Sequence, residues 1–187
     1  PDGRKARLLK PGMSLALGGI AKGYAVDQAV AAIRQVGITS ALVDAGGDIY
    51  ALGSPPYRDK WLVGVRDPAN PKGILPKALA VANQAVATSG DYLQFGTVKG
   101  HRYSHILDPR TGRPVEKMAS VTVVAPDATT ADAYATAASV LGPQKAIEFG
   151  ESRRGVEMLV IYRKDGRLVQ LRTSGFARME VVPKKED

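Results

Sequence analysis

The chain has 187 residues, of which 44% are hydrophobic, and it can therefore bury a core in one domain without covalent cross-links. It contains no cysteine, which excludes a disulfide framework and a thiolate metal site. The 26 basic and 18 acidic residues give a formal net charge of +8, which favours anionic partners. The basic residues are scattered, however, and no nucleic-acid-binding motif is present, so a nucleic acid is not an expected partner.

The predicted elements begin with an extended entry over 1–17 and a helix over 20–36, where apolar residues recur at helical spacing until Gly37. Short β-type runs separated by turn residues then predict strands at 40–43, 48–52, 61–65, 78–81, 84–88, 102–107, 118–125, 157–163 and 168–173. Further helices are expected at 130–141 and 143–153, a hairpin tip at Asn83 and Gln84, and surface loops at 54–60 and 68–76. Runs of hairpins interrupted by helices predict one α+β domain over 1–187.

A carboxylate and a hydroxyl share one face of the predicted helix at 130–141. Asp132 and Thr136 are four residues apart and have small neighbours. Their oxygens are the ligands that a hard cation prefers. The alternative is that Thr129, Thr130 and Asp132 cap the helix, which would account for Thr130 well but for Thr136 poorly.

Two glycine-rich runs are candidates for binding phosphate. The run 18–23 ends an extended segment and opens a helix, so free backbone N–H groups, the helix dipole and Lys22 could hold a phosphate. A simple tight turn is an equally good interpretation, because the run matches neither the P-loop nor the dinucleotide-binding pattern. The run 44–48, which includes Gly46 and Gly47, is by itself better explained as a turn.

Both histidines of the chain lie in the segment 101–114. His105, beside a polar turn that contains Asp108, could act as a general base or hold a phosphate. The alternative is a structural strand histidine, and this is the favoured interpretation for His101.

Five segments occur in an order that resembles the ApbE family, the FAD:protein FMN transferases. They are LGGIAKGYAVD at 17–27, DAGGDI at 44–49, ATSGDY at 87–92, SHILDPRTG at 104–112 and ADAYATA at 131–137. The resemblance implies a T-fold-like α+β domain with a mainly antiparallel sheet and helices packed on it. It also implies Mg²⁺ as a cofactor, and transfer of the FMN part of FAD to a threonine of an acceptor flavoprotein with release of AMP. The alternatives are hydrolysis of FAD to FMN and AMP, or flavin binding without catalysis.

The resemblance also assigns roles to positions. Asp132, Thr136 and the backbone carbonyl of Ala21 match metal ligands, and Lys22 would contact the diphosphate. His105 falls at the active-site histidine, so the catalytic groups would be His105 and Asp132. The positions implied to contact FAD are Gly19, Ala21, Lys22, Asp48, Ser89, Gly90 and His105.

Two positions depart from the family pattern: Ala16 stands where members usually have aspartate, and Asp44 where they usually have asparagine. The first half of the family fold does not precede Pro1, so the chain resembles a carboxy-terminal half. We therefore expect, as partners besides FAD and the acceptor flavoprotein, a polypeptide that carries the amino-terminal half, or self-association. The resemblance places the chain on the periplasmic side of a bacterial cell envelope.

Overall fold

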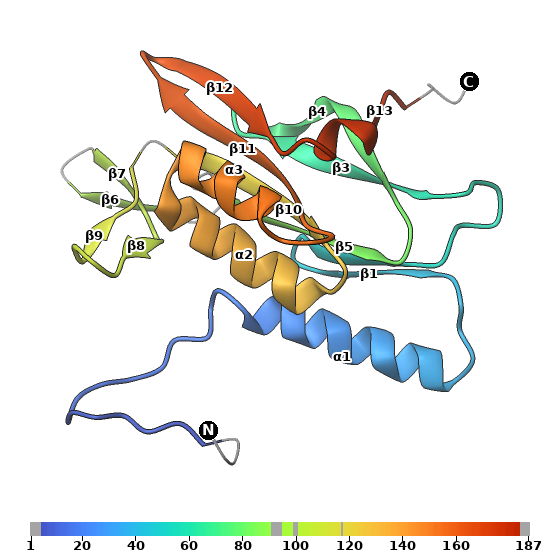
Figure 1. Cartoon of the computed structure of the whole chain (residues 1–187), viewed down its shortest axis with the longest axis horizontal. Coiled ribbons are helices and arrows are strands. Elements are labelled where there is room, and N and C mark those ends of the chain that lie inside the picture. Colours follow the sequence, from blue (N-terminus) through green and yellow to red (C-terminus); the bar gives the residue numbers. More distant parts are fainter. Residues whose placement is uncertain (1–4, 91–94, 99–100, 117, 184–187) are drawn as a thin grey trace.

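The computed structural model describes residues 5–90, 95–98, 101–116 and 118–183 (Figure 1). Its helices are α1 (Ala21–Gln35), α2 (Ala128–Leu141) and α3 (Pro143–Glu151), with a 3₁₀ turn at Phe176–Arg178. The central sheet has the order β1-β2-β5-β10-β11-β12 and is antiparallel throughout. Its strands are β1 (Ala41–Ala45), β2 (Asp48–Leu52), β5 (Gln84–Gly90), β10 (Met118–Ala125), β11 (Glu157–Lys164) and β12 (Arg167–Arg172).

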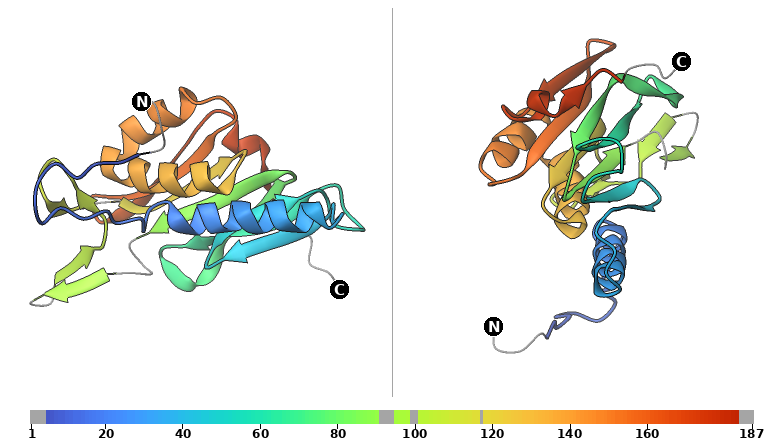
Figure 2. Two further views of the ribbon diagram at one scale, coloured as in Figure 1. Left: turned by 90° about the horizontal axis from the view of Figure 1, so that it is seen from below. Right: turned by 90° about the vertical axis from the view of Figure 1, so that its right-hand side faces the viewer.

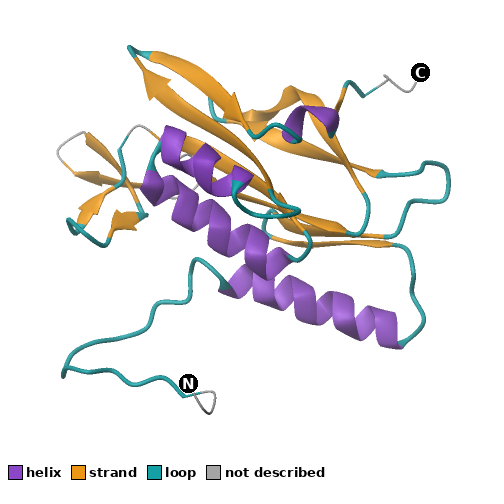
Figure 3. Cartoon of the chain, viewed as in Figure 1, coloured by secondary structure: helices purple, strands orange, loops and turns teal. Residues whose placement is uncertain are grey.

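Three smaller sheets surround the central one. The largest has the order β13-β4-β3 and consists of β13 (Glu180–Val181), β4 (Asn70–Val81) and β3 (Trp61–Asp67). The other two are the hairpins β6 (Phe95–Val98) with β7 (His101–Ser104), and β8 (Leu107–Asp108) with β9 (Arg113–Pro114). The expected α+β fold with a mainly antiparallel sheet and packed helices is confirmed (Figure 3).

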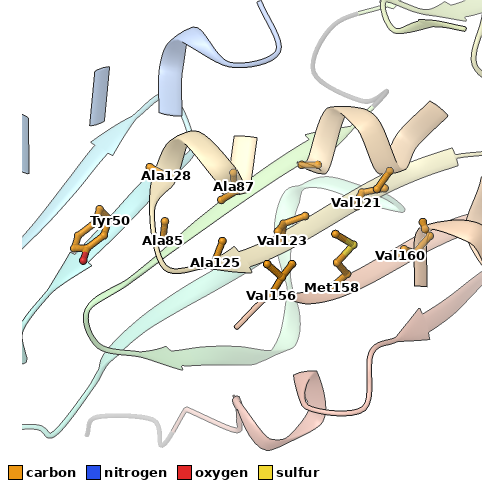
Figure 4. Close-up of a cluster of buried hydrophobic side chains, with 14 of the residues drawn as sticks. Tyr50, Ala85, Ala87, Val121, Val123, Ala125, Ala128, Val156, Met158 and Val160 are labelled. Carbon is orange, nitrogen blue, oxygen red and sulfur yellow. The ribbon is translucent and has the colours of Figure 1, made fainter. Parts of the chain in front are cut away.

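The core lies on both faces of the central sheet. On one face, Val123 and Met158 pack with alanines of α2 and with Val26 of α1, and Figure 4 shows part of this cluster. On the other face, Val124 packs with Leu79 of β4 and with Phe176. Strand β10 is buried at every position because layers cover both of its faces. The three helices therefore form one outer layer, and the β13-β4-β3 sheet forms the other.

Helix α1 and most strands lie close to their predicted positions, but three expectations were wrong. The segment 68–76 is not a loop, because β4 runs through most of it. Pro76 is accommodated where β4 is paired only with β3 and the register of that pair shifts. The predicted strand 102–107 is divided between β7 and β8.

The third error concerns the expected hairpin at Asn83 and Gln84. Asn83 has a φ of 53°, as a tight turn requires, but β4 and β5 belong to different sheets. The chain therefore uses this turn to pass from the outer sheet to the central one. Of the extended entry predicted over 1–17, residues 1–4 lie outside the described part.

Helix α1 packs closely on the start of α2, at one margin of the molecule (Figure 2). A Cβ atom on Gly23 would lie 2.1 Å from the carbonyl oxygen of Ala128. One turn further along α1, the carboxylate of Asp27 accepts hydrogen bonds from the backbone N–H groups of Ala128 at 2.8 Å and Thr129 at 2.9 Å. Helix α1 therefore satisfies two of the N–H groups that the first turn of α2 leaves unpaired.

The cap of α2 is Asp127, whose carboxylate accepts hydrogen bonds from the backbone N–H of Thr130 at 2.7 Å and from its hydroxyl at 2.9 Å. The alternative that Thr129, Thr130 and Asp132 cap this helix is therefore wrong. Asp132 is left without a role at the helix end.

Among the described helices, none is long and apolar enough to cross a membrane.

We predict that Gly23→Ala destabilises the chain by about 2 kcal/mol. Overpacking typically costs about 1–3 kcal/mol and the gain in helix propensity is at most about 1 kcal/mol, and here the added methyl meets a backbone carbonyl that cannot turn aside. Urea unfolding followed by circular dichroism measures the effect. Gly18→Ala is the control, because nothing lies within 4 Å of a Cβ at that position; equal stability of the two variants would contradict the close contact.

Candidate functional site

The start of α1 lies across the face of α2 that carries Asp132 and Thr136. A Cβ on Gly19 would lie 2.9 Å from Cγ2 and 3.1 Å from Oγ1 of Thr136. The backbone N–H of Gly23 donates to Oδ2 of Asp132 at 3.1 Å. Both glycines are therefore needed for the approach of the two segments, and the site is assembled where they meet.

Asp132 is buried, with 4% of its surface exposed. Gly23, which donates this hydrogen bond, is the third residue of α1. Its N–H is one of the four that an α-helix leaves unpaired at its start. The positive end of the helix dipole favours a carboxylate at this place. The start of α1 therefore holds the Asp132 side chain, at a position where it does not cap α2.

Lys22 is paired with Asp48, the first residue of β2. Their Nζ and Oδ1 atoms are 2.8 Å apart, and the Asp48 side chain is almost fully buried whereas that of Lys22 is half-exposed. The second oxygen of Asp48, Oδ2, is buried and accepts no hydrogen bond from any described residue.

Burial raises the pKa of Asp48 from its ordinary 3.8 to about 6, against the lowering effect of Lys22 and with a further rise from nearby Asp132. Asp48 thus lies between an ammonium group and a second carboxylate, that of Asp132. The excess negative charge would be offset by a bound cation.

Thr136 is linked to β5, because its Oγ1 lies 3.3 Å from Oγ of Ser89. Ser89 and Gly90 also line a small cavity together with Ser104 and Ile106, the two neighbours of His105. His105 itself is exposed. The two residues that flank His105 therefore lie at the end of β5, close to Ser89, the hydrogen-bond partner of Thr136.

The donor set at Asp132 fits a hard divalent cation. In the described part of the chain, no three Asp, Glu, His or Cys side chains gather to hold a metal. An ion beside Asp132 would need further oxygen ligands from hydroxyl groups, backbone carbonyls or a bound substrate. Thr136 lies one turn further along α2, and Ala21 is the first residue of α1. Mg²⁺ is commonly bound in this way, by one or two carboxylates together with substrate phosphates.

The glycine turn before β2 has the geometry predicted for it. Gly46 and Gly47 have φ of 63° and 97°, and Oδ1 of Asp44 accepts the N–H of Gly47 at 2.7 Å. The aspartate that departs from the family pattern therefore stabilises its own turn.

This turn also borders a groove of about 670 Å³ whose other walls include Arg66 and Lys72.

The sequence did not predict the pair of Lys22 and Asp48, nor the contact of Asp27 with the start of α2. Lys22 and Asp48 were each expected to contact FAD, but no local pattern joins residues on a helix and on a strand. Asp27 lies within the LGGIAKGYAVD segment, on the same helical face as Gly23, and this spacing is the signal that could have identified it.

These features define an α+β protein in which a buried carboxylate, a hydroxyl and an ammonium group meet at a helix start, an arrangement suited to phosphates and a divalent cation. The chain belongs to the ApbE family, whose model matches residues 2–160. A FAD:protein FMN transferase of Treponema pallidum is 40% identical over 165 residues, which is 83% of this chain and 46% of the relative. One of Haemophilus influenzae is 33% identical over 179 residues, which is 94% of this chain and 51% of the relative.

A crystal structure of the ApbE protein from Thermotoga maritima has the same fold, with a TM-score of 0.82 and 36% identity. The match covers 91% of this chain and 55% of that protein. The chain thus spans about half the length of the curated relatives that it matches.

We predict that Asp48→Asn stabilises the metal-free chain at neutral pH. Because the pKa of Asp48 is higher in the folded chain than its ordinary value, folding favours the protonated acid, and this contribution is complete below about pH 4 and is lost as the pH rises through 6. The variant should therefore exceed the parent by up to about 3 kcal/mol at pH 7.5, and by little at pH 4. Urea unfolding in EDTA at both pH values is the measurement; a variant that is less stable than the parent at pH 7.5 would contradict it.

Proposed function

We propose that this chain carries the Mg²⁺-dependent site that transfers the FMN part of FAD to a threonine of an acceptor flavoprotein, with release of AMP. The observation that carries the proposal is the meeting of Asp132, Thr136 and Lys22 where α1 starts. The curated relatives that the chain matches are FAD:protein FMN transferases, which supports the same reaction here.

Asp132, Thr136 and the carbonyl of Ala21 would hold the metal ion. When bound, Mg²⁺ supplies neutralisation of the negative charge that develops on the diphosphate. Lys22 and the N-terminus of α1 add positive charge on the protein side. The residues of this chain thereby bind and orient the diphosphate for displacement.

In the transfer step, the threonine oxygen of the acceptor forms a bond to the FMN phosphorus, and the bond from that phosphorus to the bridging oxygen breaks. AMP leaves with the bridging oxygen, and His105 takes the threonine proton. Water in place of threonine would give FMN and AMP instead. Exclusion of water by the acceptor therefore decides between transfer and hydrolysis.

The test is to incubate the chain with FAD and Mg²⁺, with and without an acceptor flavoprotein domain that carries a target threonine. We expect AMP release that requires the acceptor, together with a gain in acceptor mass equal to that of one FMN less one water. AMP release of equal rate without the acceptor would identify a FAD pyrophosphatase. Tight FAD binding without AMP would identify a non-catalytic flavin-binding domain, which the departure at Ala16 favours.

We predict that Asp132→Ala abolishes Mg²⁺-dependent binding of FAD while the fold is retained, because Asp132 would provide the main protein charge to the ion. Calorimetric titration with FAD, in Mg²⁺ and in EDTA, measures it. Asp127→Ala is the matched control on the same helix: it removes the cap and should cost about 1 kcal/mol of stability without loss of binding. Mg²⁺-dependent binding by a folded Asp132→Ala chain would remove Asp132 from the metal site.

We predict that His105→Asn lowers the rate of AMP release by about 10²–10⁴-fold, the usual contribution of a general base. The unfolding midpoint should change little, since the side chain is exposed. Rates are to be compared from pH 6 to pH 8. A variant with the parental rate throughout would show that another group takes the proton.

We also propose that another polypeptide covers the margin formed by β1 and the segment before α1. Strand β1 is an edge of the central sheet, and Leu9, Leu15 and Leu17 are exposed. Exposed edges and apolar side chains favour association. The partner would be a chain that carries the rest of the ApbE fold, or a second copy; a strictly monomeric chain in light scattering that gains no mass with such a partner would contradict this.

The site of action that we propose is the periplasmic side of a bacterial cell envelope, which the family resemblance supports. Fractionation of cells is the test. Recovery of the native protein in the cytoplasmic fraction alone would contradict it.

A further inference from the structure

The charged side chains around the start of α1 differ in how much of their surface is exposed to solvent. Lys22 precedes Gly23, whose N–H group holds Asp132, so the ammonium group and the candidate metal ligand are tied to one helical turn. The Lys22 side chain is 46% exposed, whereas that of Asp48 is 2% exposed. A ligand that arrives from solvent can therefore reach Lys22 but not Asp48.

The burial of Asp48 is costly for the fold. A carboxylate in the interior loses its hydration, and here only one of its two oxygens gains a cationic partner. Mutual repulsion with Asp132 adds to the cost. A residue that served only to fill the interior would not carry this charge, and the ion pair that Asp48 makes within the described part of the chain is with Lys22.

We propose that Asp48 is a positioning residue, which holds the ammonium group of Lys22 in place for the diphosphate of a nucleotide. The inference rests on the proposed function, in which Lys22 contacts the diphosphate, and it adds that Asp48 fixes the position of Lys22. An ammonium group has three N–H donors. One is directed to Oδ1 of Asp48, and the others remain for phosphate oxygens at the exposed side.

The ion pair already restricts the Lys22 side chain before a ligand binds. Less side-chain conformational entropy is therefore lost when a phosphate binds. Asp48 is anchored at the start of β2 in the central sheet, and the position of Lys22 is thus fixed relative to the sheet as well as to α1. Asp48 acts through Lys22, in place of the direct contact with FAD that the sequence resemblance implied for it.

The experiment is a double-mutant cycle of Asp48→Asn and Lys22→Ala, with ADP as the ligand and calorimetry as the readout. We expect Asp48→Asn to weaken ADP binding by roughly three- to tenfold, the effect of ordering one long side chain. In the Lys22→Ala background, Asp48→Asn should have no further effect. Adenosine, which lacks phosphates, is the matched control ligand, and its affinity should be the same in all four proteins.

Each titration is run in Mg²⁺ and in EDTA, because Asp48 is also close to Asp132. The dependence on Lys22 should persist in EDTA, since the pair does not include a metal ligand. In turnover of FAD, Asp48→Asn should raise KM more than it lowers kcat, and Asp48→Glu should restore part of the affinity. An equal loss of ADP affinity with and without Lys22, or a loss confined to Mg²⁺, overturns the inference.

The outcomes also separate this inference from the proposed function. ADP binding that depends on both residues, in a chain that releases no AMP from FAD, would retain the positioning role and overturn the transferase. Binding that depends on Lys22 but not on Asp48 would overturn only the positioning role. A parent chain that binds neither ADP nor FAD in Mg²⁺ would overturn both.

Discussion

The contact between the start of α1 and the face of α2 is the constraint on which the candidate site depends. Gly19 lies against Thr136, Gly23 against Asp132, and Asp27 holds the N–H groups at Ala128 and Thr129. Gly19, Gly23 and Asp27 are spaced four residues apart, and the residues of α2 that they contact are spaced four apart in the opposite direction. The segments are therefore antiparallel and meet once per helical turn.

Electrostatics makes this contact useful for chemistry as well as for packing. The approach of α1 brings its unpaired N–H groups to Asp132, and brings Lys22 to Asp48. Two carboxylates then lie near one ammonium group, with one carboxylate oxygen left unpaired in the interior. Such an arrangement is unfavourable for the chain alone but complementary to a bound cation, because the cation would offset the excess negative charge.

Much of the fold was predictable because its signals are local. The helical spacing of α1 and the short β-type runs of β5, β10 and β11 identify these elements from neighbouring residues alone. The length of β4 was hidden by Pro76, which is tolerated where β4 is paired on one side only. The turn at Asn83 was correctly seen as tight, but whether the two strands that it joins are paired is decided by the distant strands β3 and β2.

In the candidate site, too, the features with local sequence signals were predictable and those that depend on distant contacts were not. The spacing of Asp132 and Thr136 placed both on one helical face, and the family resemblance joined them to the glycine run at 18–23. The pairing of Lys22 with Asp48 had no local signal, because it depends on how a helix packs beside a sheet. The alternative that Thr130 caps α2 was plausible because a threonine hydroxyl has the right chemistry, but Asp127 is the cap and accepts hydrogen bonds from the N–H and the hydroxyl of Thr130.

The matched spacing of the two segments has a consequence for how this protein can change in evolution. A residue inserted or deleted between positions 19 and 27, or between 128 and 136, would rotate everything beyond it by about 100° around the helix axis. Gly23 would then no longer lie against Asp132, even if no amino acid of the site had been replaced. A change of loop length elsewhere, as between β2 and β3, would leave this register unchanged, whereas these two stretches of sequence must keep the same number of residues to preserve the site.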